Sequence, residues 1–237
     1  MEAMMSEAHE AALQAGPDDY DAVMEEYIAT HLGPSYWAQV WPSALALGQR
    51  LLARPRLAEG KRVLELGCGL GLASVCAAQA GARSVLATDI EENALAFTAA
   101  NAAANEVDAV VSVQRLDWAA AGGSGGGDGG GGNDAYDLVL CADVVYDESA
   151  PPLLASLLHT VVAEGGCVLL TDNADRPYAN ARREALLGYL TSSGEFELVP
   201  PSEDVDEPER SSTAQIELES RQGSSFTIAH CELVRSG

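Results

Sequence analysis

Short apolar runs alternate along the chain with longer amphipathic or alanine-rich stretches, a pattern typical of strands and helices taken in turn. The apolar runs predict strands at residues 62–66, 84–89, 110–116, 136–142 and 165–171. The longer stretches predict helices at residues 43–53, 73–80, 93–105, 151–163 and 180–191. Two closing strands are expected at 196–199 and 225–234, around an acidic loop at 202–210. This alternation implies a parallel sheet with helices on both faces, that is, a doubly wound α/β fold.

The first predicted strand runs directly into a glycine-rich turn, Gly67-Cys68-Gly69-Leu70-Gly71. Glycine adopts positive φ and lets a backbone pass close to a ligand, because it has no Cβ. The second strand ends at Asp89, 20 residues after Gly69. In a β-α-β unit a carboxylate at this distance accepts hydrogen bonds from ribose hydroxyls. The strand, turn, helix and acid in this order indicate a nucleoside-binding unit rather than a tight turn without a ligand.

The spacing of the glycines distinguishes two kinds of nucleoside ligand. Dinucleotide sites carry G-x-G-x-x-G/A, with a pyrophosphate at the helix N-terminus. Here the spacing is G-x-G-x-G followed by Leu72, although Ala73 weakens the contrast. Glu65 would repel a pyrophosphate but suits a ligand that carries an ammonium and a sulfonium. The turn, Glu65 and Asp89 together resemble the first two motifs of class I S-adenosylmethionine-dependent methyltransferases.

This resemblance implies S-adenosylmethionine as the cofactor. It also implies a Rossmann-like doubly wound, mostly parallel seven-stranded sheet with an antiparallel C-terminal strand. At 237 residues, with 47% hydrophobic and 21% charged residues, the chain is long and apolar enough for one sizeable α/β domain. We expect an acidic N-terminal lead-in at residues 1–34 and a methyltransferase domain at 35–237, with a flexible glycine-rich loop at 122–133.

The formal net charge of −23 argues against a nucleic-acid partner, because Lys and Arg contacts to phosphate dominate such binding. It favours a basic partner through electrostatic steering. The single lysine, Lys61, and the abundance of Ala and Gly also fit a genome-wide codon bias, so the charge does not identify a substrate.

No apolar stretch reaches the length of a membrane span, so no membrane partner is expected. Residues 1–26 contain no Arg or Lys, unlike signal and transit peptides, and a cytoplasmic location is expected. The five cysteines include no CxxC pair and are interpreted as buried free thiols. The four histidines are scattered, so no metal site is expected.

Three further segments resemble the methyltransferase-like family 16 of seven-β-strand protein methyltransferases. They are the tryptophan segment that begins Val40-Trp41-Pro42, the Leu116-Asp117-Trp118 segment, and Ala142-Asp143-Val144-Val145-Tyr146. The resemblance runs from about residue 36 to 163. Most known members methylate protein lysines, and at least one relative is associated with histone arginine. The resemblance, with the turn and its acid, implies a cofactor pocket made of Trp41, Glu65, Gly67, Cys68, Gly69, Asp89, Asp117, Trp118 and Ala142.

Physical roles accompany some of these positions. Trp118 can cover the adenine face, and Asp117 can accept a hydrogen bond from the exocyclic amine or from solvent. Ala142 must be small, because the cofactor passes over the end of the fourth strand. For Trp41 an equally good interpretation is a core anchor of the helix that follows it.

Asp143 and Tyr146 are the predicted catalytic residues. They face the same side if a helical turn begins there, at the crevice outside the carboxyl ends of the strands. Asp143 could hold the incoming amine, and the Tyr146 ring could bound it through a cation–π contact. The alternative is that Asp143 caps a helix starting at Tyr146.

The segment of residues 172–178 follows the fifth strand, where family members commonly place substrate-side residues. Within it, Arg176-Pro177-Tyr178 resembles the mitochondrial electron-transfer-flavoprotein lysine methyltransferases. The acidic N-terminus argues against a mitochondrial address, and that identity is not adopted. A plain β-α loop is an equal interpretation of the segment.

The leading hypothesis is therefore an S-adenosylmethionine-dependent methyltransferase that acts on a protein side chain, most often lysine in this family. One alternative is a small-molecule N- or O-methyltransferase on the same fold. With 5% aromatic residues, the chain gives little support to a compact aromatic lid over a small substrate. A catalytically silent cofactor-binding scaffold is the other alternative. The substrate protein, the degree of methylation and the oligomeric state stay open.

Overall fold

The computed structural model describes residues 36–121, 135–175, 179–199, 214–219 and 225–236, with backbone alone at 214–219 and 225–226. The chain separates into two units, Met1–Gln39 and Val40–Gly237. In the first unit the description is limited to residues 36–39, with a short 3₁₀ turn, η1 (Tyr36–Ala38). The whole acidic lead-in, the glycine-rich loop, residues 176–178 and the acidic loop at 202–210 lie outside the described residues.

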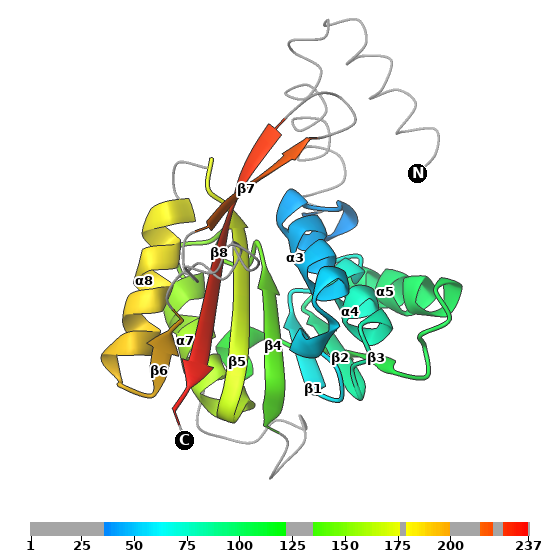
Figure 1. Cartoon of the computed structure of the whole chain (residues 1–237), viewed down its shortest axis with the longest axis horizontal. Coiled ribbons are helices and arrows are strands. Elements are labelled where there is room, and N and C mark those ends of the chain that lie inside the picture. The colour runs from blue at the N-terminus through cyan, green and yellow to red at the C-terminus, as the bar shows by residue number, and fades with distance from the viewer. Residues whose placement is uncertain (1–35, 122–134, 176–178, 200–213, 220–224, 237) are drawn as a thin grey trace, which may run out of the picture. The chain divides into compact units, whose positions relative to one another are not determined.

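The second unit is built on one mixed sheet in the order β3-β2-β1-β4-β5-β8-β6, with β7 paired to β8 (Figure 1). Strands β3, β2, β1, β4 and β5 are parallel, and β8 is antiparallel to β5, β6 and β7. The strands span β1 (Arg62–Leu66), β2 (Ser84–Asp89), β3 (Val111–Arg115), β4 (Tyr136–Ala142), β5 (Val162–Asn173), β6 (Phe196–Leu198), β7 (Ala214–Glu219) and β8 (Ser225–Arg235).

This arrangement confirms the predicted doubly wound, mostly parallel sheet with an antiparallel C-terminal strand. The prediction missed β7, which adds an eighth strand. Its sequence, Ala-Gln-Ile-Glu-Leu-Glu, alternates apolar and polar residues over only six positions next to an acidic region. Strand β5 begins three residues earlier than predicted, at Val162, because it continues straight from the end of the preceding helix.

Helices cover both faces of the sheet. On one face α3 (Pro42–Ala53), α4 (Leu72–Gln79) and α5 (Glu92–Ala104) pack on the sheet, and α7 (Ala150–Val161) and α8 (Ala179–Ser192) cover the other face. A 3₁₀ turn, η2 (Pro55–Leu57), follows α3, and a single helical turn, α6 (Trp118–Ala121), follows β3.

Alternation along β1 shows how the sheet divides two hydrophobic cores. Val63 belongs to the core under α3, α4 and α5, whereas Leu64 and Leu66 belong to the core under α7 and α8. Because successive side chains point to opposite faces, a strand buried on both sides must be apolar throughout. This explains the continuous apolar runs of the sequence.

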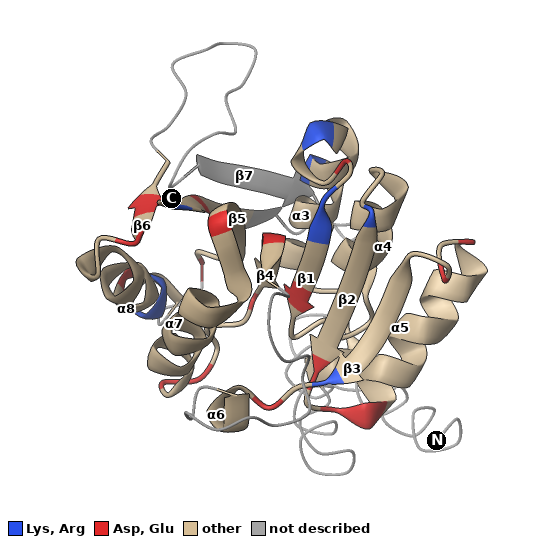
Figure 2. Cartoon of the chain, turned by 90° about the horizontal axis from the view of Figure 1, so that it is seen from below, with Lys and Arg blue, Asp and Glu red and all other residues tan. Residues whose placement is uncertain are grey.

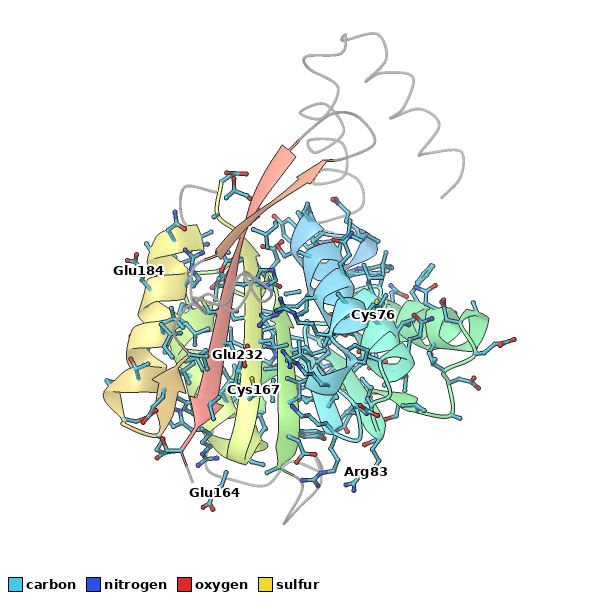
Figure 3. All side chains as sticks on the ribbon, in the orientation of Figure 1. Cys76, Arg83, Glu164, Cys167, Glu184 and Glu232 are labelled. Carbon is cyan, nitrogen blue, oxygen red and sulfur yellow. The ribbon has the colours of Figure 1, made fainter. Side chains whose placement is uncertain are left out.

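Buried ion pairs tie the outer elements to the sheet. Arg50 of α3 donates to Glu232 of β8 across 2.6 Å, and Arg183 of α8 pairs with Asp172 of β5. Figure 3 shows Glu232 on β8 beside Cys167 on β5. All five cysteines are free; four are buried and Cys167 is half-buried, which agrees with the interpretation as unpaired thiols.

Two kinds of feature are absent from the described residues. No helix there is both long and apolar enough to cross a bilayer. No group of three or more His, Cys, Asp or Glu side chains is arranged to hold a metal ion in that part of the chain.

The strand order places a topological switch between β1 and β4. From β1 the chain winds toward β2 and β3, and it then returns to the other side of β1 as β4. In open α/β sheets ligands bind at such a point, outside the carboxyl ends of the strands. Leu66 is in register with both Thr88 and Cys141, so the residues that follow them, Gly67, Asp89 and Ala142, reach the same edge.

Candidate active site

The glycine-rich turn between β1 and α4 has a backbone that favours glycine at three positions. Gly67, Gly69 and Gly71 have φ of 68°, 53° and 76°. At Gly71 space is limiting as well, because a Cβ there would lie 2.5 Å from Cγ2 of Thr98. The turn is therefore both left-handed and closely packed against α5, which leaves its backbone as the surface next to the switch point.

Two polar side chains of α5 hold this turn. The Thr98 hydroxyl donates to the Gly69 carbonyl at 3.0 Å, and the Asn101 amide donates to the Leu70 carbonyl at 2.8 Å. The sequence analysis did not identify Thr98 or Asn101. The available signal was their spacing of three residues in an otherwise alanine-rich helix, which places both on one face.

Asp89 lies at the end of β2 with only 8% of its surface exposed. Its Oδ2 accepts a hydrogen bond from the Gly69 amide at 2.9 Å, and its Oδ1 accepts one from the Glu91 amide at 3.0 Å. The carboxylate is thus held against the glycine turn, as the spacing of 20 residues predicts. Each carboxylate oxygen retains a lone pair, which leaves Asp89 able to accept from a ligand hydroxyl.

Glu65 lies beneath the turn and is buried. Its Oε2 accepts hydrogen bonds from the Ser74 amide, at 2.8 Å, and from the Ser74 hydroxyl. Glu65 therefore joins β1 to the first turn of α4 and fixes the far side of the glycine turn. Burial in a low-dielectric environment raises the pKa of Glu65 to about 7.

We expect the Glu65→Gln variant to gain stability relative to wild type as the pH rises. The folded-state pKa of about 7 lies above the ordinary value of 4.5, so wild-type stability is fully present below pH 4.5 and declines until pH 7. Glutamine does not ionise and still offers an oxygen to Ser74. Between pH 5 and 8 the difference in unfolding free energy should change by roughly 2–3 kcal/mol. Urea unfolding at both pH values measures it, and a constant difference would contradict the burial argument.

Trp118 reaches the glycine turn from the segment after β3. A Cβ built on Gly67 would lie 3.5 Å from an indole carbon of Trp118 and 3.4 Å from Cγ1 of Val144. The segments after β1, β3 and β4 therefore meet around Gly67. Asp117 accepts a hydrogen bond from the Ala119 amide at 3.0 Å and so begins the single turn α6. Its predicted contact with adenine stays a prediction.

The remaining predicted cofactor residues surround the same edge. Cys68 is buried, and its backbone amide donates to the Thr88 carbonyl at 2.8 Å, which connects the turn to β2. Ala142 is half-buried at the last position of β4. Trp41 is the N-cap residue of α3 and is half-buried, and neither hydrophobic core of the described residues includes it. Both interpretations of Trp41, a cofactor contact and a core anchor of α3, stay predictions.

Asp143 follows β4 with a left-handed backbone, at φ 55°, and is 8% exposed. Non-glycine residues rarely adopt this conformation, although Asp and Asn tolerate it best. Its Oδ2 accepts a hydrogen bond from the Ser43 hydroxyl at 2.8 Å, and its Oδ1 accepts one from the backbone amide of Asn173 at 3.3 Å. The carboxylate is thus fixed at the edge of the sheet beside the residues of the predicted cofactor pocket.

The predicted helical turn after Asp143 is absent, which corrects two interpretations. Helix α7 begins only at Ala150, with Ser149 as its N-cap residue. Asp143 therefore does not cap this helix, and the i, i+3 argument for its facing Tyr146 fails. The cause is Pro151 and Pro152, which favour the first turn of a helix and place its start later. Tyr146 is 48% exposed, and its carbonyl accepts a hydrogen bond from Arg182.

Comparison with known proteins first defines the class. TYW2 from P. horikoshii in complex with MeSAdo superimposes with a TM-score of 0.54, covering 84% of this chain and 65% of that one at 13% identity. At this identity the likeness shows the shared fold alone. The architecture and the glycine turn are those of the class I methyltransferases.

Sequence comparison then defines the family. A family model described as lysine methyltransferase matches residues 25–183, and the chain belongs to this family. The electron transfer flavoprotein beta subunit lysine methyltransferase of Xenopus laevis is 33% identical over 70% of this chain and 62% of its own length. The protein-lysine N-methyltransferase EFM3 of Chaetomium thermophilum is 33% identical over 69% of this chain. The chain spans 49% of the length of EFM3 and 62% of the Xenopus protein, so it covers only part of these relatives.

The cofactor of this class is S-adenosylmethionine, and the residues at the switch point fit it. A Cβ at Gly67 would approach the Trp118 indole, so the glycine keeps the space beside that ring open. Asp89 supplies negative charge beside the turn, which suits a ligand bearing ammonium and sulfonium groups, whereas Glu65, with its raised pKa of about 7, is only partly ionised near neutral pH. An anionic pyrophosphate would be repelled by the Asp89 carboxylate.

Proposed function

We propose that this chain transfers a methyl group from S-adenosylmethionine to the side-chain amine of a protein lysine. The observation that carries the proposal is Asp143, a buried carboxylate fixed by hydrogen bonds at the end of β4 and next to the predicted cofactor pocket. Family membership and the names of the two relatives support lysine as the acceptor.

The cofactor, when bound, supplies a methyl carbon that its sulfonium makes electrophilic. The protein has to hold the acceptor nitrogen in line with that carbon, because positioning alone can contribute several kcal/mol to the rate. Asp143 can attract and orient the amine, since its negatively charged carboxylate is held at the end of β4 by Ser43 and by the backbone amide of Asn173. Tyr146 is half exposed four residues past the end of β4, where its ring can bound the cationic product.

A small-molecule N- or O-methyltransferase is the second candidate, because class I sites share the cofactor pocket and differ in what covers it. The half-exposed Tyr146 favours a large partner, since a small substrate needs an enclosed site. Incubating the protein with tritiated cofactor and a cell lysate tests the choice. Labelled protein bands support the proposal, and label confined to small molecules would favour the second candidate.

We also propose that the protein partner carries basic residues around the target lysine. Among the described residues, the carboxyl ends of the parallel strands and the segments after them carry more acidic than basic residues. The acidic ones are Asp89, Glu91, Glu92, Asp117, Asp143, Asp147, Glu148, Asp172 and Asp175, and the basic ones are Arg115, Arg182 and Arg183. Arg182 and Arg183 are themselves paired with Glu148 and Asp172. The opposite edge is mixed: it carries Arg54, Arg56, Lys61, Arg62 and Arg83 together with Glu59, Glu106, Asp108, Asp137 and Glu164, and Figure 3 labels Arg83 and Glu164 there (Figures 2 and 3).

This charge difference gives a measurable expectation. The double variant Asp147→Asn/Glu148→Gln should raise the KM for a protein substrate roughly 2- to 5-fold at low salt, because it removes steering charge at the site edge. A matched pair at the opposite edge, Glu106→Gln/Asp108→Asn, should leave KM near wild type. Added salt should reduce the difference between the two double variants. Equal KM values at low salt would contradict the proposal.

A further inference from the structure

Ser43 is a buried polar residue in the first turn of α3 that the sequence motifs do not single out. It is 0% exposed. Its hydroxyl donates to Oδ2 of Asp143 at 2.8 Å, although the two residues lie 100 positions apart in the chain. Its carbonyl accepts a hydrogen bond from the Thr171 hydroxyl at 3.2 Å. One residue of α3 thus contacts the ends of both β4 and β5.

Two further contacts restrain Asp143. The Asn173 amide donates to Oδ1 at 3.3 Å, and the amide of Asp143 donates to the Thr171 carbonyl at 2.8 Å. The backbone of Asp143 is held at φ 55°. A strained backbone of this kind persists only where its surroundings determine it, and such residues concentrate at active sites.

Helix α3 does not itself need the Ser43 hydroxyl. The N-cap residue of α3 is Trp41, with Pro42 at the first helical position and no side-chain cap hydrogen bond. Alanine has a higher helix propensity than serine at a position inside the helix. The hydroxyl instead donates its hydrogen bond outside the helix, to the Asp143 carboxylate, which is buried and largely shielded from water.

We infer that Ser43 is a positioning residue for methyl transfer. Its hydroxyl orients the Asp143 carboxylate at the end of β4, where the incoming amine has to be held, and this role rests on the function proposed above. Trp41 lies two residues before Ser43, so a role through the cofactor pocket is the competing explanation. The two explanations differ in what the Ser43→Ala variant does to cofactor affinity.

The test compares Ser43→Ala and Ser43→Thr with wild type. It uses tritiated cofactor and, as the substrate, a protein that becomes labelled in the lysate assay described above. The loss of a hydrogen bond to a charged group should lower kcat/KM in Ser43→Ala roughly tenfold. The Kd for S-adenosylmethionine, measured by calorimetry, should stay within about twofold, and Ser43→Thr should recover most of the rate because it keeps the hydroxyl. The control is Ser112→Ala on β3, where an exposed serine bonds only a strand carbonyl.

A double-mutant cycle keeps the inference testable if threonine does not fit the buried position. Ser43→Ala added to Asp143→Asn should lower the rate no further, because Ser43 acts through that carboxylate. A further tenfold loss in the double variant, or a parallel loss of cofactor affinity in Ser43→Ala, would overturn the inference. A wild-type rate in Ser43→Ala would overturn this inference but not the proposed function. Wild-type protein that binds the cofactor but methylates no protein would overturn the proposed function and this role with it.

Discussion

The Asp143→Asn variant is expected to transfer methyl groups roughly 30- to 1000-fold more slowly than wild type, which corresponds to about 2–4 kcal/mol of lost transition-state positioning. Asparagine tolerates the left-handed backbone that Asp143 adopts, so the substitution should not add backbone strain. It removes the negative charge that attracts and orients an amine. Radiolabel transfer at saturating cofactor measures the effect.

Two controls separate this result from a folding defect. The asparagine side chain can accept only one of the bonds from Ser43 and Asn173, so the melting temperature of the variant has to be measured alongside its rate. Cofactor affinity should stay close to wild type, and Asp108→Asn, an exposed acid at the opposite edge of the sheet, should retain the wild-type rate. Transfer at the wild-type rate by Asp143→Asn would remove the main residue-level support for lysine methylation. Tyr146→Ala should also lower the rate, because it removes the ring that is proposed to bound the amine.

The Asp89→Ala variant is expected to bind S-adenosylmethionine about 1–3 kcal/mol more weakly, or roughly 5- to 150-fold in Kd. The reason is the loss of charged hydrogen bonds to the ligand, together with the loss of the bond from the Gly69 amide at 2.9 Å that holds the glycine turn. Calorimetric titration with the cofactor and with its demethylated product measures the change.

The Asp89→Asn variant separates the loss of ligand hydrogen bonds from the loss of the bond to the Gly69 amide. It keeps an oxygen for one backbone amide but lacks the charge, so its affinity should fall between those of wild type and Asp89→Ala. Asp108→Ala serves as the matched control, since it removes an exposed acid far from the glycine turn in sequence. Binding by Asp89→Ala with wild-type affinity would show that another group holds the ribose.

The sequence predicted most of the architecture because both signals for it are local. Apolar runs such as Tyr136–Ala142 mark strands buried on two faces, and their alternation with helices determines a parallel sheet. The positive φ of Gly67, Gly69 and Gly71 and the contact between Asp89 and Gly69 were likewise predictable, because spacing within one β-α-β unit determines them.

Contacts between distant segments were not predictable in the same way. The bond from Ser43 to Asp143 joins residues 100 positions apart, and it depends on how α3 docks on the ends of β4 and β5. Thr98 and Asn101 hold the glycine turn from another helix. Their spacing places them on one face of α5, but it does not say that this face contacts the turn. The prediction of a helical turn directly after Asp143 was wrong, because Pro151 and Pro152 favour the first turn of a helix and α7 begins only at Ala150.

Methyl transfer to a lysine side chain can be tested directly. The purified protein is incubated with tritiated S-adenosylmethionine and a cell lysate, and each labelled band is analysed by mass spectrometry for the modified residue. We expect protein bands that carry methyl groups on lysine and that fade with Asp143→Asn. Label on arginine alone, label confined to small molecules, or no label from a protein that binds the cofactor would contradict methyl transfer to lysine.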